Sequence, residues 1–342
     1  MTEYSLRINP IAFELGPITV HWYGIILGLG ALMGLVLAIR EGKRFGISSD
    51  FFMDLLLLGV PSAIIAARAY FVLFKWDYYR QHPGEILAIW NGGIAIYGAL
   101  IGAIICAIFY VRRKGLNFWR IVDICAPSLL IGQIIGRWGN FVNQEAYGGP
   151  VTRRFLSGEL HLPDWIVDQM YVESTGQFHH PTFLYESVWN IIGILLIFVL
   201  RRRPWVRAGE MFFTYLIWYS IGRFFIEGLR TDSLAFAGPA WLESLMNGLW
   251  SPMKILFEPG YLDPAYGNVR SSQLIAVLAI LFCIVMIIVR RSTGLAAERY
   301  SDPVINRKTG LPAGVEPQEA QPVSEAAKEN HHDENAHTKP TV

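Results

Sequence analysis

Charged residues are scarce in this chain. Asp, Glu, Lys and Arg make up 17% of its 342 residues, whereas 53% are hydrophobic. An average soluble domain carries about 25% charged residues, so this balance favours a protein that crosses a membrane several times. The net charge of +1 offers no basic surplus, which argues against a nucleic-acid partner.

Cysteine is also scarce, and no cleavable leader is evident. Cys106, Cys125 and Cys283 all fall in apolar stretches, where they are expected to be inert, unpaired small hydrophobes. Residues 1–17 lack the basic region, short apolar core and small-residue cleavage site of a signal peptide. The first apolar stretch is therefore predicted to act as its own uncleaved insertion signal.

Long apolar runs make up much of the sequence. A spanning helix needs about 20 mostly apolar residues, and seven stretches qualify. They lie at about residues 18–39, 51–74, 94–111, 121–140, 184–200, 210–227 and 273–289. The sequence therefore predicts an all-α integral membrane protein with about seven transmembrane helices. Charged residues interrupt the second, fourth and sixth stretches, and such residues usually face the bundle interior. These residues are Asp54, Arg68, Asp123, Arg137, Arg223 and Glu227.

Basic residues fix a predicted orientation because they follow alternate spans. They are Arg40, Lys43, Arg44, Arg112, Arg113, Lys114, Arg201, Arg202, Arg203, Arg207, Arg290 and Arg291. The positive-inside rule then places the N-terminus outside and the C-terminus in the cytoplasm. Residues 1–291 form one membrane domain with two outer insertions, 141–183 and 228–272. Residues 292–342 are polar and are predicted to be a disordered cytoplasmic tail, whose removal beyond Arg299 should leave activity intact.

Polar side chains of several spans are predicted to gather at one depth, in the outer leaflet. Arg137 and Asn140 end the fourth span, and Arg223 and Glu227 share one face of the sixth. The inward-running spans begin with tyrosines and a carboxylate at the same level. These are Tyr23, Tyr97, Tyr185 and Glu186. Because guanidinium groups bind phosphate oxygens in a fixed plane, we expect a phospholipid headgroup site open to the outer leaflet.

Structural roles remain as alternatives for each of these residues taken alone. Arg223 and Glu227 could form an ion pair that only supports packing. Arg137 could extend from a helix end to the interface, and the tyrosines could belong to an interfacial aromatic belt. The spacing of Gly98 and Gly102 indicates close helix packing.

Five blocks, taken in order, resemble the prolipoprotein diacylglyceryl transferase family of bacteria. They read HWYG at 21–24, NGGIAIYGALIG at 91–102, GRWGNFVNQEAYGG at 136–149, HPTFLYE at 180–186 and YSIGRFFIEGLR at 219–230. The resemblance implies transfer of a diacylglyceryl group from phosphatidylglycerol to the lipobox cysteine thiol of a prolipoprotein signal peptide. It implies the bacterial cytoplasmic (inner) membrane as the location, membrane lipids as surroundings, and neither cofactor nor metal.

The resemblance also assigns site residues. Its catalytic positions match Arg137, Arg223, Tyr97, Glu145, Asn140 and Tyr23. Its substrate-binding positions include Arg137, Asn140 and Arg223 and add Gly148, Tyr219, Glu227, Arg230, His180 and Glu186. Within this set, Gly148 is expected to provide a backbone turn.

Tyr97 stands where well-known members carry a histidine proposed as the base for the thiol. A neutral tyrosine, with an ordinary pKa of about 10, is a poor base for a thiol near 8.5. We therefore expect Tyr97 to position thiol or lipid, while the arginines lower the thiol pKa or Glu145 accepts the proton. His180 is a second candidate base, although a histidine before proline more often bonds backbone in a loop-to-helix turn.

Two other classes of protein remain in consideration. A transporter or lipid flippase would need a polar route through the inner half of the bilayer, where only Asp54 and Asp123 stand out, and no internal repeat is visible. A non-catalytic assembly protein would not need this set of polar residues at one level. The histidines at 331, 332 and 337 are a weak candidate metal site because no fixed geometry surrounds them.

Overall fold

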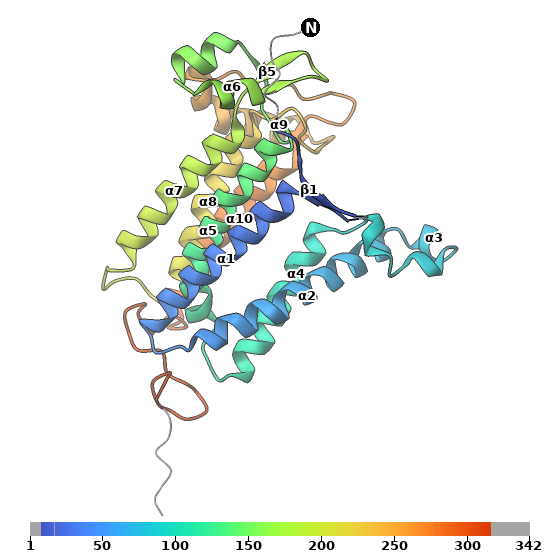
Figure 1. Cartoon of the computed structure of the whole chain (residues 1–342). Helices are drawn as coiled ribbons and strands as arrows, with labels where there is room; N and C mark the ends of the chain where they lie inside the picture. The colour runs from blue at the N-terminus through green and yellow to red at the C-terminus, as the bar shows by residue number, and fades with distance from the viewer. Residues whose placement is uncertain (1–7, 17, 316–342) are drawn as a thin grey trace, which may run out of the picture.

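The computed structural model describes residues 8–16 and 18–315. It is mostly helical (Figure 1), and six of its described helices are long and apolar enough to cross a membrane. They are α1 Trp22–Lys43, α2 Ser49–Phe74, α4 Ile96–Arg113, α5 Phe118–Val142, α7 Thr182–Leu200 and α10 Ser271–Ser292. The predicted all-α membrane fold is confirmed. The histidines of the candidate metal site lie outside the described residues.

The predicted span 210–227 coincides with helix α8, Glu210–Glu227. This helix packs against α5, α7 and α10. Because it contains several polar residues, it is not among the six helices that are apolar enough to cross a membrane. Its N-terminus is capped from another helix, because the buried Asp123 carboxylate of α5 accepts hydrogen bonds from the N–H groups of Gly209 (2.6 Å) and Phe212 (2.9 Å). The count of seven spans and their orientation stay predictions.

The helices form a main bundle and a diverging pair. In the bundle, α1 packs on α5, α5 on α7, and α8 on α10. Helices α2 and α4 lie side by side and lead away from the bundle toward the short helix α3, Trp76–Tyr79 (Figure 1). Gly98 and Gly102 allow this pairing, since an added Cβ would lie 2.5 Å from the Ala66 carbonyl oxygen and 2.6 Å from that of Ser62, respectively.

One end of the bundle, here called the head end, is built from the two predicted insertions (Figure 1). The first contains β3 Pro150–Val151, η3 Phe155–Glu159, α6 Asp164–Gln169, β4 Tyr171–Val172 and β5 Gln177–His179. The second contains β6 Ala235–Phe236, α9 Ala240–Trp250, η4 Ser251–Ile255 and β7 Val269–Arg270. Strand β5 pairs antiparallel with both β3 and β4, and β6 pairs with β7. Before α1, β1 Ile11–Leu15 and β2 Ile18–His21 form a hairpin, and η1 Pro83–Glu85 and η2 Ile89–Asn91 precede α4.

The opposite end, here called the tail end, differs from the expectation of disorder from residue 292 onward. Residues 293–315 pack against the bundle, with Tyr300 and Val304 buried. The buried Arg120 of α5 donates hydrogen bonds to the carbonyl oxygens of Arg299 and Asp302. A few apolar side chains and backbone carbonyls therefore hold a segment whose composition is mostly polar. Residues 316–342 lie outside the described part.

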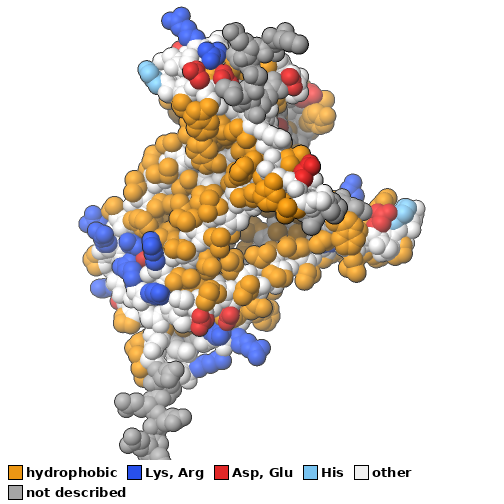
Figure 2. Space-filling view, in the orientation of Figure 1, with side chains coloured by type: hydrophobic (Ala, Val, Ile, Leu, Met, Phe, Trp, Pro, Cys, Tyr) orange, Lys and Arg blue, Asp and Glu red, His pale blue; other side chains and the backbone are white. Residues whose placement is uncertain are grey.

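Apolar side chains cover the lipid-facing middle of the molecule (Figure 2). Exposed large residues on α1, α2 and α10 include Leu32, Leu57, Ile65, Leu278 and Phe282. Lys and Arg side chains gather beside the tail end, and charged side chains reappear at the head end (Figure 2). This distribution is typical of a protein that crosses a membrane.

Candidate functional site

The last turns of α5 present the first part of a polar cluster. Arg137 forms a 2.6 Å ion pair with the buried carboxylate of Glu186 in α7, at an angle outside hydrogen-bond geometry. It also donates to the side-chain oxygen of Asn140 (3.3 Å), and its charge acts on the hydroxyl of Tyr219 in α8. Three helices therefore meet at this one guanidinium group.

The end of α8 supplies the second part. The Glu227 carboxylate is almost completely buried and forms ion pairs with Arg223 (2.7 Å) and Arg230 (3.8 Å). Arg230 is also held by Asp232 through two hydrogen bonds of 2.8 and 2.7 Å. Burial lowers the pKa of Arg230, but the hydrogen bonds and charge of Asp232 and the charge of Glu227 outweigh it and raise that pKa.

Arg223 differs from the other two arginines. Its ion pair with Glu227 uses one terminal nitrogen. Within residues 8–16 and 18–315, its guanidinium group has no other ion pair or hydrogen bond. About a fifth of its side chain is exposed. It therefore keeps N–H donors available on a group whose position is fixed by Glu227.

The loop after α5 turns a carboxylate back onto the helix end. Gln144 (φ 50°) and Ala146 (φ 57°) adopt left-handed backbone conformations on either side of Glu145. Such strain at non-glycine residues persists only where the surroundings hold it. The Gln144 side chain donates to the carbonyls of Gln169 (2.7 Å) and Tyr171 (2.9 Å). Glu145 then accepts a 2.8 Å hydrogen bond from Asn140, beside a small cavity that the same loop lines.

The loop after α5, residues 143–149, is here called the signature loop. Its Gly148 joins it to the second insertion and to the start of α7. It pairs with Arg230 as an isolated antiparallel bridge, and its N–H donates to the His180 carbonyl (3.1 Å). Its φ is not positive, so the expected turn does not explain the glycine. Close approach does: an added Cβ would lie 2.7 Å from the His180 Cβ and 3.2 Å from the Leu229 carbonyl oxygen.

His180 is buried between aromatic rings. Its ring lies edge-on to Phe155 and Phe257, and its Nδ1 lies 3.1 Å from the Tyr185 hydroxyl. Burial, with a smaller contribution from His179, lowers its pKa to about 4. The imidazole is therefore neutral at pH 7 and enclosed by its aromatic neighbours.

The two predicted catalytic tyrosines lie in different surroundings. The Tyr23 ring packs on α5 at Gly139, since an added Cβ there would lie 2.7 Å from its Cδ2. Tyr97 is 54% exposed at the start of α4, a helix that packs mainly on α2. No hydrogen bond of its hydroxyl is recorded in the described chain, and no recorded contact joins it to Arg137.

Some polar residues that the sequence did not indicate as part of the site hold other polar groups in place. Asp232 orients Arg230, and buried Gln169 donates to the carbonyls of Phe141 (3.2 Å) and Val142 (3.1 Å). Arg68 donates to four carbonyls in the segment before α4, those of Glu85, Ile86, Gly92 and Gly93. Only the intramembrane position of Arg68 marked it in the sequence. Its role depends on a loop that folds back onto α2.

The fold and this cluster define a multi-pass membrane protein with a polar arginine–carboxylate site near the head end. No group of three or more His, Cys, Asp or Glu side chains within the described ranges is placed to hold a metal ion. A family model for prolipoprotein diacylglyceryl transferase matches residues 10–289. The chain belongs to the prolipoprotein diacylglyceryl transferase family, as the resemblance predicted.

Relatives match the chain over almost their whole length. The phosphatidylglycerol–prolipoprotein diacylglyceryl transferase of Bacillus velezensis is 50% identical over 302 residues, which cover 88% of this chain and 99% of the relative. The protein of the same name from Bacillus licheniformis is 50% identical over 302 residues, 88% of this chain and 100% of the relative. That of Bacillus cereus strain G9842 is 50% identical over 296 residues, covering 86% and 97%, respectively.

Proposed function

We propose that this protein transfers the diacylglyceryl group of phosphatidylglycerol to the lipobox cysteine of a prolipoprotein, the first step of bacterial lipoprotein maturation. Its family and the names of relatives with 50% identity support this reaction. The substrates are phosphatidylglycerol and the prolipoprotein signal peptide. The protein lies in the cytoplasmic (inner) membrane, with the head end and the site toward the outer leaflet.

The single observation that carries the proposal is that Arg223 is held by an ion pair and still has free N–H donors. Glu227 holds one edge of its guanidinium group, while the remaining N–H groups have no recorded partner in the described chain. A planar cation held in this way is suited to phosphate oxygens. Arg137, held by Glu186 in the same manner, supplies the second cation. Both carboxylates are buried, so they orient the arginines and do not themselves face the substrate.

The chemistry requires such cations. The cysteine sulfur forms a bond to the terminal glycerol carbon, the bond from that carbon to the phosphate oxygen breaks, and glycerol phosphate leaves. Negative charge therefore develops on the departing phosphate, where fixed guanidinium groups stabilise it. Arg137 and Arg223 take this role, Asn140 and Tyr23 contact the headgroup, and Arg230 and Tyr219 complete its polar surroundings.

In this proposal, the carboxylate of Glu145 accepts the thiol proton. Glu145 is a carboxylate of the signature loop, reaches Asn140 at 2.8 Å, and is turned there by the strained residues on either side. His180 is not the base in this proposal because it is buried between aromatic rings and its Nδ1 lies at the Tyr185 hydroxyl. The positive charge of the arginines stabilises the thiolate, so a carboxylate with modest basicity suffices.

Arg223→Lys tests the phosphate role directly. It keeps the positive charge but removes the planar fork, so transfer from phosphatidylglycerol to a lipobox peptide should fall by about 100-fold or more, the range for loss of one oriented donor. The matched control is Arg153→Lys, which alters a partly exposed head-end arginine paired with Asp164 and Asp168. Equal turnover of both variants, each with an unchanged melting temperature, would remove Arg223 from the reaction.

Tyr97→Phe tests the hydroxyl of the tyrosine that replaces the usual histidine. If Tyr97 positions the thiol or the lipid by a hydrogen bond, turnover should fall by about fivefold, because a lost hydrogen bond costs about 1 kcal/mol. The variant should melt normally, since the side chain is exposed. Wild-type turnover would show that the hydroxyl is not needed.

A lipid flippase is the alternative of a different class. It would move phosphatidylglycerol between leaflets without making a thioether. Purified protein with phosphatidylglycerol and a lipobox peptide distinguishes the two, because only the transferase yields a thioether-linked product and free glycerol phosphate.

A further inference from the structure

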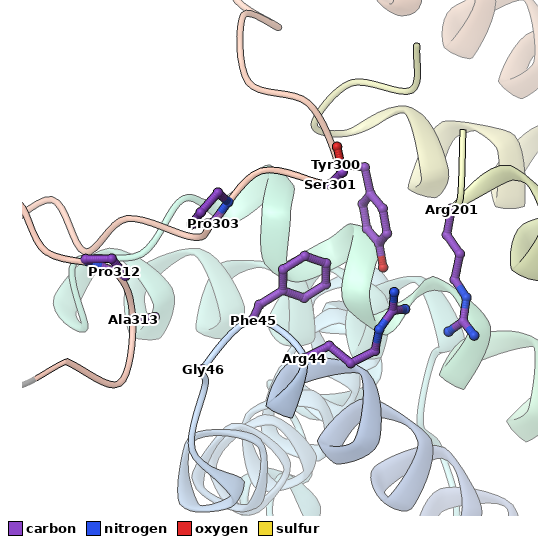
Figure 3. Close-up of a pocket in the computed structure, with 9 residues that line it drawn as sticks. All are labelled: Arg44, Phe45, Gly46, Arg201, Tyr300, Ser301, Pro303, Pro312 and Ala313. Atoms are coloured by element: carbon purple, nitrogen blue, oxygen red, sulfur yellow. The ribbon is translucent and has the colours of Figure 1, made fainter. Parts of the chain in front are cut away.

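A cavity of about 390 Å³ lies at the tail end, at the opposite end of the bundle from the arginine–carboxylate cluster. Figure 3 shows Arg44 and Phe45, which follow α1, and Arg201, which follows α7, together with residues of the 293–315 segment. That segment contributes Tyr300, Ser301, Pro303, Pro312 and Ala313. This volume falls in the range of small-molecule sites.

The cavity has a surplus of positive charge. The buried carboxylate of Glu41 accepts hydrogen bonds from Arg44 (2.6 Å) and from Arg201, and a third from the Tyr300 hydroxyl (2.7 Å). One carboxylate thus faces two guanidinium groups. Asp302, the nearest acid along the segment, is turned to the Arg299 N–H (2.8 Å). Further basic residues, Arg40, Lys43, Arg202 and Arg203, adjoin the cavity in the sequence, and Figure 2 shows basic side chains gathered at this end.

Both arginines keep donors that Glu41 does not use. Arg201 uses only one terminal nitrogen for Glu41, and its side chain is 19% exposed. Arg44 is 48% exposed and uses only one terminal nitrogen for Glu41. The terminal nitrogens that Glu41 does not engage can donate to an incoming oxygen ligand.

The surroundings favour a lipid over a free ion. The cavity lies where α1 and α7 end, at the border of the apolar surface, and Trp205 is exposed nearby in the chain. Phe45 and Tyr300 provide apolar walls beside the guanidinium groups, and Pro303 and Pro312 line the cavity farther from them (Figure 3). Basic pockets between transmembrane helices at this level bind headgroups of anionic lipids.

We infer that this cavity binds the phosphate of an anionic phospholipid in the leaflet at the tail end. Arg44 and Arg201 hold the phosphate oxygens, and the aromatic and proline side chains contact the glycerol region. The bound lipid would join α1, α7 and the 293–315 segment. This site is separate from the proposed active site and does not depend on the proposed reaction.

Lipid counting by native mass spectrometry tests the inference. The full chain in neutral detergent would carry Arg137→Ala and Arg223→Ala, which remove the headgroup contacts at the head end. Phosphatidylglycerol should still bind to this protein, and phosphatidylcholine should bind far more weakly. Adding Arg44→Gln should weaken the remaining phosphatidylglycerol binding by about tenfold, as expected for the loss of a charge-assisted hydrogen bond. Glu41 keeps Arg201 and Tyr300 as partners in this variant, so the fold should persist.

Two further variants make the outcome decisive. Ser301→Glu places a negative charge at the cavity and should also weaken binding, whereas Arg202→Gln, outside the lining, should not. Residual phosphatidylglycerol binding that is unaffected by both Arg44→Gln and Ser301→Glu would overturn the inference. If inorganic phosphate displaced the lipid at equal concentration, the glycerol and acyl groups would contribute nothing to the affinity. That result would overturn the assignment of the site to a lipid.

Discussion

At the scale of single residues, buried carboxylates prepare arginines for an anion. Glu186 and Glu227 are both buried, and each holds one edge of an arginine that is itself partly exposed. A lone buried carboxylate would be costly, and a lone arginine would be mobile. Pairing removes both problems and leaves unused donors on the exposed edge of the cation. The energetic role of each pair is therefore orientation more than stability.

His180 gives a pH-dependent prediction. Its pKa is lowered from 6.5 to about 4 in the folded protein because it is buried. The unfolded chain takes up the proton near pH 6.5 and the folded chain only near pH 4, so this contribution to stability is complete above pH 6.5 and is lost as the pH falls toward 4. The loss is on the order of 2 to 3 kcal/mol.

The measurement is the unfolding midpoint at several pH values between 7 and 4 for the wild type and for His180→Gln. The variant loses ring packing and should melt lower at pH 7, but its midpoint should fall less on acidification. His179, whose pKa burial also lowers, is retained in both proteins. Parallel pH profiles would show that His180 does not titrate between these limits.

At the scale of elements, short segments connect the helices at both ends of the bundle. At the head end, the N–H groups of Gly148 and Gly149 bond to the carbonyls of His180 and Leu229, so the signature loop is joined to the start of α7 and to the end of α8. At the tail end, the N–H groups of Ala208 and Tyr300 bond to the carbonyls of Glu298 (2.9 Å) and Val206 (2.9 Å). The 293–315 segment is thus tied to the connection between α7 and α8.

Truncation tests the role of that segment. A chain ending at residue 292 leaves Arg120 without its two carbonyl acceptors and removes the buried Tyr300 from Glu41. Each unsatisfied buried group costs about 1 to 3 kcal/mol, so the melting temperature should fall by several degrees and turnover should fall with it. This revises the expectation that removal beyond Arg299 leaves turnover intact.

The matched control is a chain ending at residue 315, which retains every one of these contacts. It should melt and turn over like the full chain. Equal melting temperatures for the chains ending at 292 and 315 would show that the packed segment does not stabilise the bundle.

At the scale of the whole molecule, the chain has two chemically different ends separated by an apolar band (Figure 2). The head end carries the arginine–carboxylate cluster, and the tail end carries the basic residues that follow α1, α4, α7 and α10. The positive-inside rule therefore predicts that the head end faces outward and the tail end faces the cytoplasm.

Cysteine labelling in intact cells tests this orientation. Glu159→Cys, exposed at the head end, should react with a membrane-impermeant maleimide, whereas Arg307→Cys, exposed at the tail end, should react only after permeabilisation. The wild type is the control, since its three cysteines lie within helices α4, α5 and α10. If only Arg307→Cys reacted in intact cells, the orientation would be the opposite of the predicted one.

Apolar runs and motif blocks made much of this protein predictable. All seven predicted stretches are helices close to their expected bounds, and six of them are apolar enough to cross a membrane, because a run of about 20 apolar residues has few other stable forms in a bilayer. The i, i+4 spacing of Arg223 and Glu227 predicted their ion pair. The family followed from five ordered blocks and was confirmed by comparison.

Contacts between distant segments were decided only by the tertiary structure. The partner of Arg137 is Glu186, not the nearby Glu145, because α5 and α7 pack together. Gly148 is required by the close approach of His180, and the 293–315 segment is held by carbonyl groups that composition does not reveal. The sequence by itself determined which segments are apolar and which residues carry charge, since both are local properties. Which charges meet depends on helix packing, which is a property of the whole chain.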